Sequence, residues 1–184
     1  IQGCIEKYAV PEGEWVPVLQ WNPYEGNQPS ATNPTLRAAL DAASTKHPIF
    51  LFGNDGHHGG ANSMALNSVS PALNAQSLKT DYRALADLVA VDGSGNPTGG
   101  LNEGAMTLVG AAAEEGLVQP AEVVMPKVAA FLASRGITSI QDASVQWAAL
   151  KQYKWLSDSD RMTFRLRTAL NYPLQNGHSP EDLA

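Results

Sequence analysis

Short apolar stretches alternate with polar, glycine- and proline-rich stretches along this chain, and their periods predict a series of short helices and strands. The continuous apolar run over residues 49–52 is typical of a buried strand. A helical spacing of apolar residues predicts an amphipathic helix over 35–44. The other elements expected before residue 120 are a helix over 1–9, a strand over 14–21 that Pro17 restricts to an edge or a bulge, a turn over 55–60 followed by a helix to 66, a hairpin of 85–91 with 98–101, and a helix over 103–114.

The last third of the chain has the pattern of a strand–helix–strand unit. Strands are expected over 136–142 and 162–170, and the helix between them gives a crossover of about 10–15 residues, which favours parallel pairing. That helix is expected over 145–156. A further helix is expected over 121–135 with four apolar residues facing inward, namely Val124, Val128, Phe131 and Leu132.

The two ends of the chain indicate a piece of a longer protein. The first residue is not methionine, and at the other end Ser179 and Pro180 have the N-cap and first-turn positions of a helix that then runs out of chain. A lone strand–helix–strand unit also leaves two sheet edges and a wide apolar face open. We therefore expect self-association, or a rearranged C-terminal unit.

Composition excludes some classes of partner. The 184 residues carry a net charge of −6 with a pI near 5.1, so no basic stripe is available for nucleic acid. No apolar run approaches the roughly 20 residues of a membrane span. The single cysteine, Cys4, cannot form an internal disulfide, which leaves the compartment open, with the cytoplasm favoured.

Candidate chemistry gathers where the 49–52 strand ends. Asp55, His57 and His58 lie in a glycine-rich turn, and α/β proteins commonly hold reactive groups in such a place. The His57 side chain could donate a hydrogen bond to a substrate carbonyl or an oxyanion. Alternatively, Asp55 and His57 bond each other and the loop backbone to hold the turn. A metal site of all three residues is the weaker option, because zinc needs at least three converging protein ligands.

Two further acids follow predicted strands. Glu103 starts a helix, where the helix dipole alone explains an anion, although a contact to substrate is the other option. Asp142 ends a strand, where it either contributes to a site or caps the helix expected to begin near Ser144. His47 and His178 are expected to be solvated. The four tryptophans are expected to pack in the core or between subunits; they are Trp15, Trp21, Trp147 and Trp155.

Three motifs in the same order resemble amidohydrolase family 3, the formamide-deformylase-like metal-dependent hydrolases. The first is Asp-Gly-His at 55–57, followed by Asn62 and by Ala-Leu at 65–66. The second is a hairpin with the pattern Asp-Gly-x-Gly-x-Pro-x-Gly-x-Leu-x-Glu over 92–103, with Met106 just after it. The third is Gly-Ile-Thr-Ser-x-x-Asp-Ala over 136–143. The match spans nearly the whole chain, although the position of Gln141 is commonly His in the family.

The resemblance implies a fold class and a chemistry. The parent protein would be a (β/α)₈ barrel with one or two divalent metal ions, usually zinc, that activate water to cleave C–N bonds of amide-type substrates. This chain would be an internal α+β fragment: a roll-like insertion, or lid, domain over 1–120 and a partial barrel segment over 121–184, with barrel strands two and three. The metal-binding His-x-His would precede Ile1 and the other ligands would follow Ala184, so no native metal is expected here.

The residues that the resemblance places toward the substrate are His57, Asp55, Asn62, Glu103 and Asp142. Three hypotheses of function follow. The first is a fragment of a metal-dependent amidohydrolase that is inactive in isolation. The second is a non-catalytic α+β module that uses residues 55–58 to bind a partner or substrate. The third, and weakest, is a small stand-alone hydrolase built on Asp55, His57 and Glu103.

Overall fold

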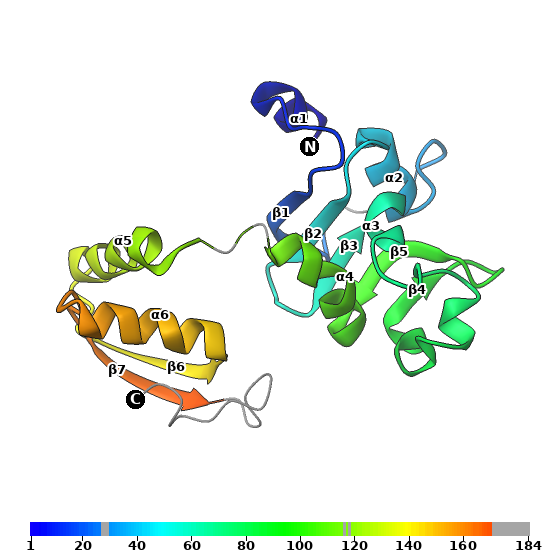
Figure 1. Ribbon diagram of the computed structural model, residues 1–184. Coiled ribbons are helices and arrows are strands. Elements are labelled where there is room, and N and C mark those ends of the chain that lie inside the picture. Colours follow the sequence, from blue (N-terminus) through cyan, green and yellow to red (C-terminus); the bar gives the residue numbers. More distant parts are fainter. Residues whose placement is uncertain (27–29, 116, 118, 171–184) are drawn as a thin grey trace. The chain divides into compact units, whose positions relative to one another are not determined.

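The computed structural model describes residues 1–26, 30–115, 117 and 119–170. The chain divides into two compact units, Ile1–Val118 and Gln119–Ala184 (Figure 1). Throughout the described residues the fold is mixed α+β and contains no closed barrel, in agreement with the expected fold class. The interpretation of the two units as a lid domain and a barrel segment stays a prediction.

A five-stranded sheet organises the first unit, in the order β1-β2-β3-β5-β4. The β1–β2 pair is parallel and the other pairs are antiparallel. The elements are α1 (Gln2–Tyr8), β1 (Val16–Trp21), α2 (Leu36–Ala43), β2 (Ile49–Gly53), β3 (His58–Ala61), α3 (Ser63–Asn67), the 3₁₀ helices η1 (Ser77–Lys79) and η2 (Arg83–Leu88), β4 (Val89–Val91), β5 (Pro97–Asn102) and α4 (Glu103–Glu115).

Strand β2 is buried because helices cover both faces of the sheet (Figure 1). Phe50 faces a core that includes Val109 of α4, whereas Ile49 and Leu51 face a separate core with Leu40 of α2. Successive side chains of a strand point to opposite faces, so this division places α4 and α2 on opposite sides of the sheet. The run of apolar residues predicted this burial correctly.

The residues after β2 differ from the prediction. The sequence indicates a turn over 55–60, but residues 58–61 form β3, which pairs with both β2 and β5. The glycines of β3 serve packing. A Cβ atom on Gly59 would lie 2.7 Å from Cγ of Met106, and a Cβ atom on Gly60 would lie 2.8 Å from Cδ2 of Leu36. Glycine therefore lets α4 and α2 approach the sheet closely. From composition alone, glycines with this packing role cannot be distinguished from glycines that form a turn.

One strand prediction needs correction and another is confirmed. Residues 85–88, expected in a strand, lie in η2, where Leu85 and Leu88 pack against the main core from a helical turn. A short apolar run does not distinguish these two states. The expectation for β1 is confirmed, because it is the edge strand next to β2 and its register shifts between Val18 and Trp21.

His47 is buried, not solvated as expected. Its Nε2 lies 3.1 Å from the carbonyl oxygen of Val10, which can only accept, so Nε2 carries the proton. Its Nδ1 then accepts from the hydroxyl of Ser44, 2.8 Å away. The imidazole thus joins the segment before β1 to the end of α2, a pairing across 37 residues that the local sequence does not reveal.

The second unit consists of a strand–helix–strand arrangement with one helix before it. Its elements are α5 (Ala121–Ser134), β6 (Ser139–Val145), α6 (Trp147–Asp158) and β7 (Arg165–Leu170), and β6 and β7 pair in parallel as predicted. Both helices pack on the face of the sheet that bears Ile140 and Leu166 (Figure 1). Phe131 was expected to face inward but is 58% exposed; Met125 and Ala129 face the core instead.

Two expectations remain, one for the C-terminal residues and one for membrane spans. The helix expected from Ser179, and His178 before it, lie outside the described residues. Within the described ranges, no helix combines the length and the apolar character that crossing a membrane requires.

Candidate functional site

Asp55 fixes the turn between β2 and β3. Its Oδ1 accepts the backbone N–H of His57 at 3.0 Å and that of His58 at 3.2 Å. Its Oδ2 lies 2.6 Å from Nδ1 of His58 and accepts the hydroxyl of Tyr24 at 2.9 Å. The Tyr24 and His58 rings also meet edge to face, with centroids 5.5 Å apart. One carboxylate thereby holds both histidine backbones and two side chains.

These bonds keep Asp55 ionised. The N–H of His57 makes the largest contribution to lowering the pKa of Asp55 far below its ordinary value of 3.8. Desolvation raises it, but the bonds from Tyr24 and from His58 add to the lowering. An ionised carboxylate only accepts hydrogen bonds, so Nδ1 of His58 must carry the proton. The bond to Asp55 in turn raises the pKa of Tyr24 and keeps its hydroxyl protonated.

His57 and Glu103 form a second acid–imidazole pair. Nδ1 of His57 lies 2.9 Å from Oε1 of Glu103. The pairing of β3 with β5 brings these residues together across 46 positions, since His58 lies opposite Asn102 in the ladder. The backbone N–H of Glu103 also donates to the carbonyl oxygen of His57 at 2.9 Å. The contact therefore has both a backbone and a side-chain part.

The His57–Glu103 pair is open to solvent and carries backbone strain. Both side chains are more than half exposed. Glu103 has φ of 46°, in the left-handed region that non-glycine residues seldom adopt. Strain of this kind is concentrated at functional sites. With Nδ1 committed to Glu103, the neutral ring presents an unprotonated Nε2 that can accept a proton, and the protonated ring can donate from Nε2 to a carbonyl oxygen.

The other two expected site residues lie elsewhere. Asn62 is fully buried, and its amide makes four hydrogen bonds: Oδ1 accepts from Ile49 and Ala65, and Nδ2 donates to the carbonyls of Ser44 and His47. No hydrogen-bonding position of this amide is left for a ligand. Asn62 is also the N-cap of α3.

Asp142 lies within β6 of the second unit, not at its end. Its Oδ2 accepts the hydroxyl of Tyr153 at 3.0 Å, and its Oδ1 accepts the backbone N–H of Ser144 at 3.2 Å. Helix α6 begins later than expected, with Gln146 at its N-cap. The expectation that Asp142 caps this helix is therefore wrong. The carboxylate ties the strand to the helix through Tyr153. Burial, with a further contribution from the bond to Asp142, raises the pKa of that phenol.

The site does not fit a metal ion. Among residues 1–26, 30–115, 117 and 119–170, no group of three or more His, Cys, Asp or Glu side chains is arranged to hold one. The weaker option of a site made of Asp55, His57 and His58 is not supported, because the two imidazoles bond different carboxylates.

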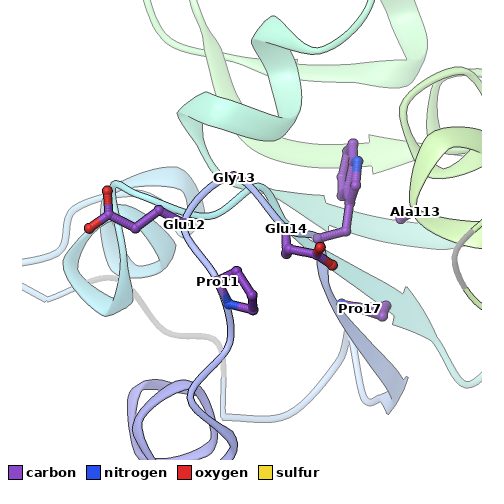
Figure 2. Close-up of a pocket in the computed structure, with 7 residues that line it drawn as sticks. Pro11, Glu12, Gly13, Glu14, Pro17 and Ala113 are labelled. Carbon is purple, nitrogen blue, oxygen red and sulfur yellow. The ribbon is translucent and has the colours of Figure 1, made fainter.

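A separate pocket of about 570 Å³ lies beside β1 and carries little chemistry (Figure 2). Figure 2 shows the Glu12 and Glu14 carboxylates extending away from each other. The Glu12 carboxylate pairs with Lys46, and that ammonium lowers the pKa of Glu12. Prolines, a glycine and Ala113 form much of the remaining wall.

Tyr24 is the site residue that the sequence did not indicate. It lies in the loop between β1 and α2, and 31 residues separate it from Asp55. The sequence around a tyrosine in a proline- and glycine-rich loop does not indicate which residue it bonds, because the contact depends on how the loop returns to the end of β2.

The sequence is similar to part of a hydrolase. Over 170 residues the chain is 29% identical to N-substituted formamide deformylase from Arthrobacter pascens, a match that covers 89% of this chain and 30% of that protein. Over 174 residues it is 27% identical to Protein LONG AFTER FAR-RED 3 from Arabidopsis thaliana, covering 89% of this chain and 28% of that protein. No family model matches the chain.

Two solved structures also align with the chain. One is an uncharacterized metal-dependent hydrolase from Pyrococcus horikoshii OT3, with 18% identity, a TM-score of 0.47 and coverage of 91% of this chain and 30% of that chain. The other is an uncharacterized metal-dependent hydrolase from Pyrococcus furiosus, with 21% identity, a TM-score of 0.47 and coverage of 92% of this chain and 31% of that chain. The chain thus spans less than a third of the relatives it matches. The similarity to formamide deformylase confirms the amidohydrolase resemblance inferred from the motifs.

Proposed function

We propose that this chain is a segment of a metal-dependent amidohydrolase that cleaves C–N bonds of amide- or formamide-type substrates. The similarity to N-substituted formamide deformylase along 89% of the chain carries the proposal. A small amide-type molecule is the proposed substrate, because that relative's name describes removal of a formyl group from nitrogen. Zinc is the proposed metal, and residues of the parent protein outside this chain would hold it, since the described residues do not fit a metal site.

Within this segment, His57 is the proposed catalytic residue and Glu103 its positioning residue. The exposed imidazole can donate a hydrogen bond from Nε2 to the substrate carbonyl or to the tetrahedral oxyanion once it is protonated. The Glu103 carboxylate fixes the ring orientation by holding Nδ1 at 2.9 Å. Asp55 supports the arrangement by holding the His57 backbone. Asn62 is left out of the proposal because all its polar positions are used internally.

A longer form of the protein that contains this segment would test these roles. We expect His57→Gln to lower kcat/KM for an N-substituted formamide about 100-fold, the scale of one lost oxyanion donor. Glu103→Gln keeps an acceptor for Nδ1 but removes the charge, so a smaller loss of about tenfold is expected. Asp158→Asn is the matched control, because it removes the carboxylate of the similarly exposed Lys154–Asp158 pair. Equal rates for His57→Gln and the control would refute the role of His57.

The 184-residue chain by itself is proposed to be inactive. The assay is incubation of the purified chain with zinc and an N-substituted formamide, followed by detection of released formate. We expect no formate above the level given by zinc alone. Formate release that disappears in His57→Ala would contradict the proposal and would favour the stand-alone hydrolase. Saturable substrate binding by the longer protein without any turnover would instead favour the non-catalytic binding module.

A further inference from the structure

Tyr24 is connected to His57 through the Asp55 carboxylate. The hydroxyl of Tyr24 donates to Oδ2 of Asp55 at 2.9 Å, and Oδ1 of the same carboxylate accepts the backbone N–H of His57 at 3.0 Å. The Tyr24 ring also meets the His58 ring edge to face. A residue in the loop between β1 and α2 is therefore only two hydrogen bonds away from the proposed catalytic residue.

The backbone is strained on both sides of this connection. Gln20, near the end of β1, has φ of 59°, and Glu103, the partner of the His57 imidazole, has φ of 46°. Both values lie in the left-handed region, which costs a non-glycine residue about 1–3 kcal/mol. At Gln20 the strain coincides with the shift of register between Val18 and Trp21. Irregularities of this kind bend a strand and change the direction of the side chains that follow.

Two hydrogen bonds direct the chain from this irregularity to Asp55. The backbone N–H of Asn54 donates to the carbonyl oxygen of Trp21 at 2.8 Å, which joins the end of β1 to the residue before Asp55. Oδ1 of Asn22 accepts the backbone N–H of Tyr24 at 3.0 Å, a side-chain turn that fixes the course of the loop. The backbone itself therefore brings Tyr24 to Asp55.

The Tyr24 hydroxyl completes the hydrogen bonding of Asp55. Oδ1 accepts two backbone N–H groups, and Oδ2 accepts from Nδ1 of His58 as well as from Tyr24. These bonds use all the acceptor positions of a carboxylate. Without the hydroxyl, Oδ2 keeps a single donor, and the carboxylate can turn about its Cβ–Cγ bond, a torsion with a broad energy minimum. The bond to the His57 backbone would move with it.

We propose that Tyr24 is a positioning residue for His57 and acts through Asp55. The hydroxyl holds the carboxylate in the orientation that fixes the His57 backbone, and Glu103 holds the imidazole at Nδ1, 2.9 Å away. The residue is then fixed at both its backbone and its ring. Such precision matters because a displacement of about 1 Å can lower a rate about 100-fold. This role rests on the function proposed for His57, so one of its tests needs no enzymatic activity.

Kinetics of a longer form that contains this segment give the first test. Tyr24→Phe removes the hydroxyl and keeps the ring. We expect it to lower kcat for an N-substituted formamide about tenfold, with KM unchanged, because a displaced imidazole affects the reacting geometry more than substrate binding. Tyr82→Phe is the matched control, since its hydroxyl donates to the carbonyl oxygen of Pro71 at 2.8 Å and not to Asp55. Equal values of kcat in the two variants would overturn the inference.

A double variant shows whether Tyr24 acts through His57. If it does, Tyr24→Phe adds no further loss in a protein that already carries His57→Gln. Residues that act independently give losses that multiply. A further tenfold loss in the double variant would therefore overturn the inference. So would an unchanged kcat in Tyr24→Phe where His57→Gln alone is impaired, and that result would leave the function proposed for His57 in place.

NMR of the purified 184-residue chain gives the second test. It decides the matter if the longer form shows no turnover, or if His57→Gln leaves its turnover unimpaired. Either of those results counts against the proposed function but says nothing of how the imidazole is held. We expect Tyr24→Phe to shift the Nδ1 and Nε2 signals of His57, whereas Tyr82→Phe leaves them at their wild-type positions. Signals of the His57 ring that respond equally to both variants, or to neither, would overturn the inference.

Discussion

Nδ1 of His58 lies 2.6 Å from Oδ2 of Asp55, and the same carboxylate accepts the backbone N–H of His58 through its other oxygen. This double contact closes the turn between β2 and β3 on itself. His57 directly precedes β3, and the pairing of β3 with β5 places it next to Glu103. Asp55 holds the backbone of His57 without contacting its imidazole nitrogens, so the geometry of the His57–Glu103 pair depends on Asp55. Asp55 is thus a positioning residue for the candidate site.

Asp55 should make the stability of the chain sensitive to acid. Its pKa in the folded state is lowered from an ordinary 3.8, so its contribution to folding is present above that value and is lost as the pH falls toward the folded-state pKa. We expect the free energy of unfolding of Asp55→Asn to be below wild type at neutral pH and to approach it below about pH 4. Urea unfolding over this pH range measures the difference. Asp87→Asn, at an exposed position in η2, controls for the loss of one charge.

Asn62→Ala should destabilise the first unit strongly. The substitution removes the acceptor of two backbone N–H groups and the donor to two backbone carbonyls, all at a fully buried position. Buried backbone groups left without partners cost about 1–3 kcal/mol each, so for four groups we expect a loss of at least about 4 kcal/mol. Asn67→Ala, at an exposed position at the end of α3, should change stability by less than about 0.5 kcal/mol. Similar urea midpoints for the two variants would contradict this account.

Three glycines of the β4–β5 hairpin should respond differently to alanine. At Gly99, with φ of 103°, a Cβ atom would lie 2.5 Å from the backbone nitrogen of Arg37, which cannot move aside without shifting α2. Gly95 has φ of 84°, but a Cβ atom there would meet only Cβ of Ala75 at an ordinary contact distance of 4.0 Å, and Gly93 has neither restriction. We expect losses of more than about 3 kcal/mol at Gly99, about 1 kcal/mol at Gly95 and close to zero at Gly93. Thermal unfolding of the three variants gives the order, and a mild effect at Gly99 would show that α2 does not approach β5 this closely.

Local patterns predicted much of the fold but only part of the site. Periodicity identified β2, α2 and the parallel pairing of β6 with β7, because in these segments burial decides the period. It failed at β3, where glycines needed for helix packing look like a turn, and at η2, where a short apolar run fits a strand or a helical turn equally well.

Contacts in the site were predictable only where the two contacting residues are close in sequence. Asp55 and the two histidine backbones are neighbours, and the sequence indicated their turn. The bonds of Tyr24 to Asp55 and of Glu103 to His57 span 31 and 46 residues and depend on strand register and loop path. His47 shows the same limit, since a histidine before a proline gives no sign that it will bridge Ser44 and Val10.

Self-association of the chain remains a prediction that the exposed apolar side chains of the second unit support. Phe131 is 58% exposed, and Val123, Ile137 and Leu170 are each more than a third exposed. Removing such groups from water favours association by roughly 25 cal/mol for each Å² of apolar surface. We expect sedimentation velocity to show a weight-average mass that rises with concentration. Phe131→Gln should reduce this rise, whereas Tyr8→Gln, which alters an even more exposed aromatic residue of α1, should not. A single monomeric boundary at every concentration would rule out the association, and an equal effect of both variants would place it elsewhere on the chain.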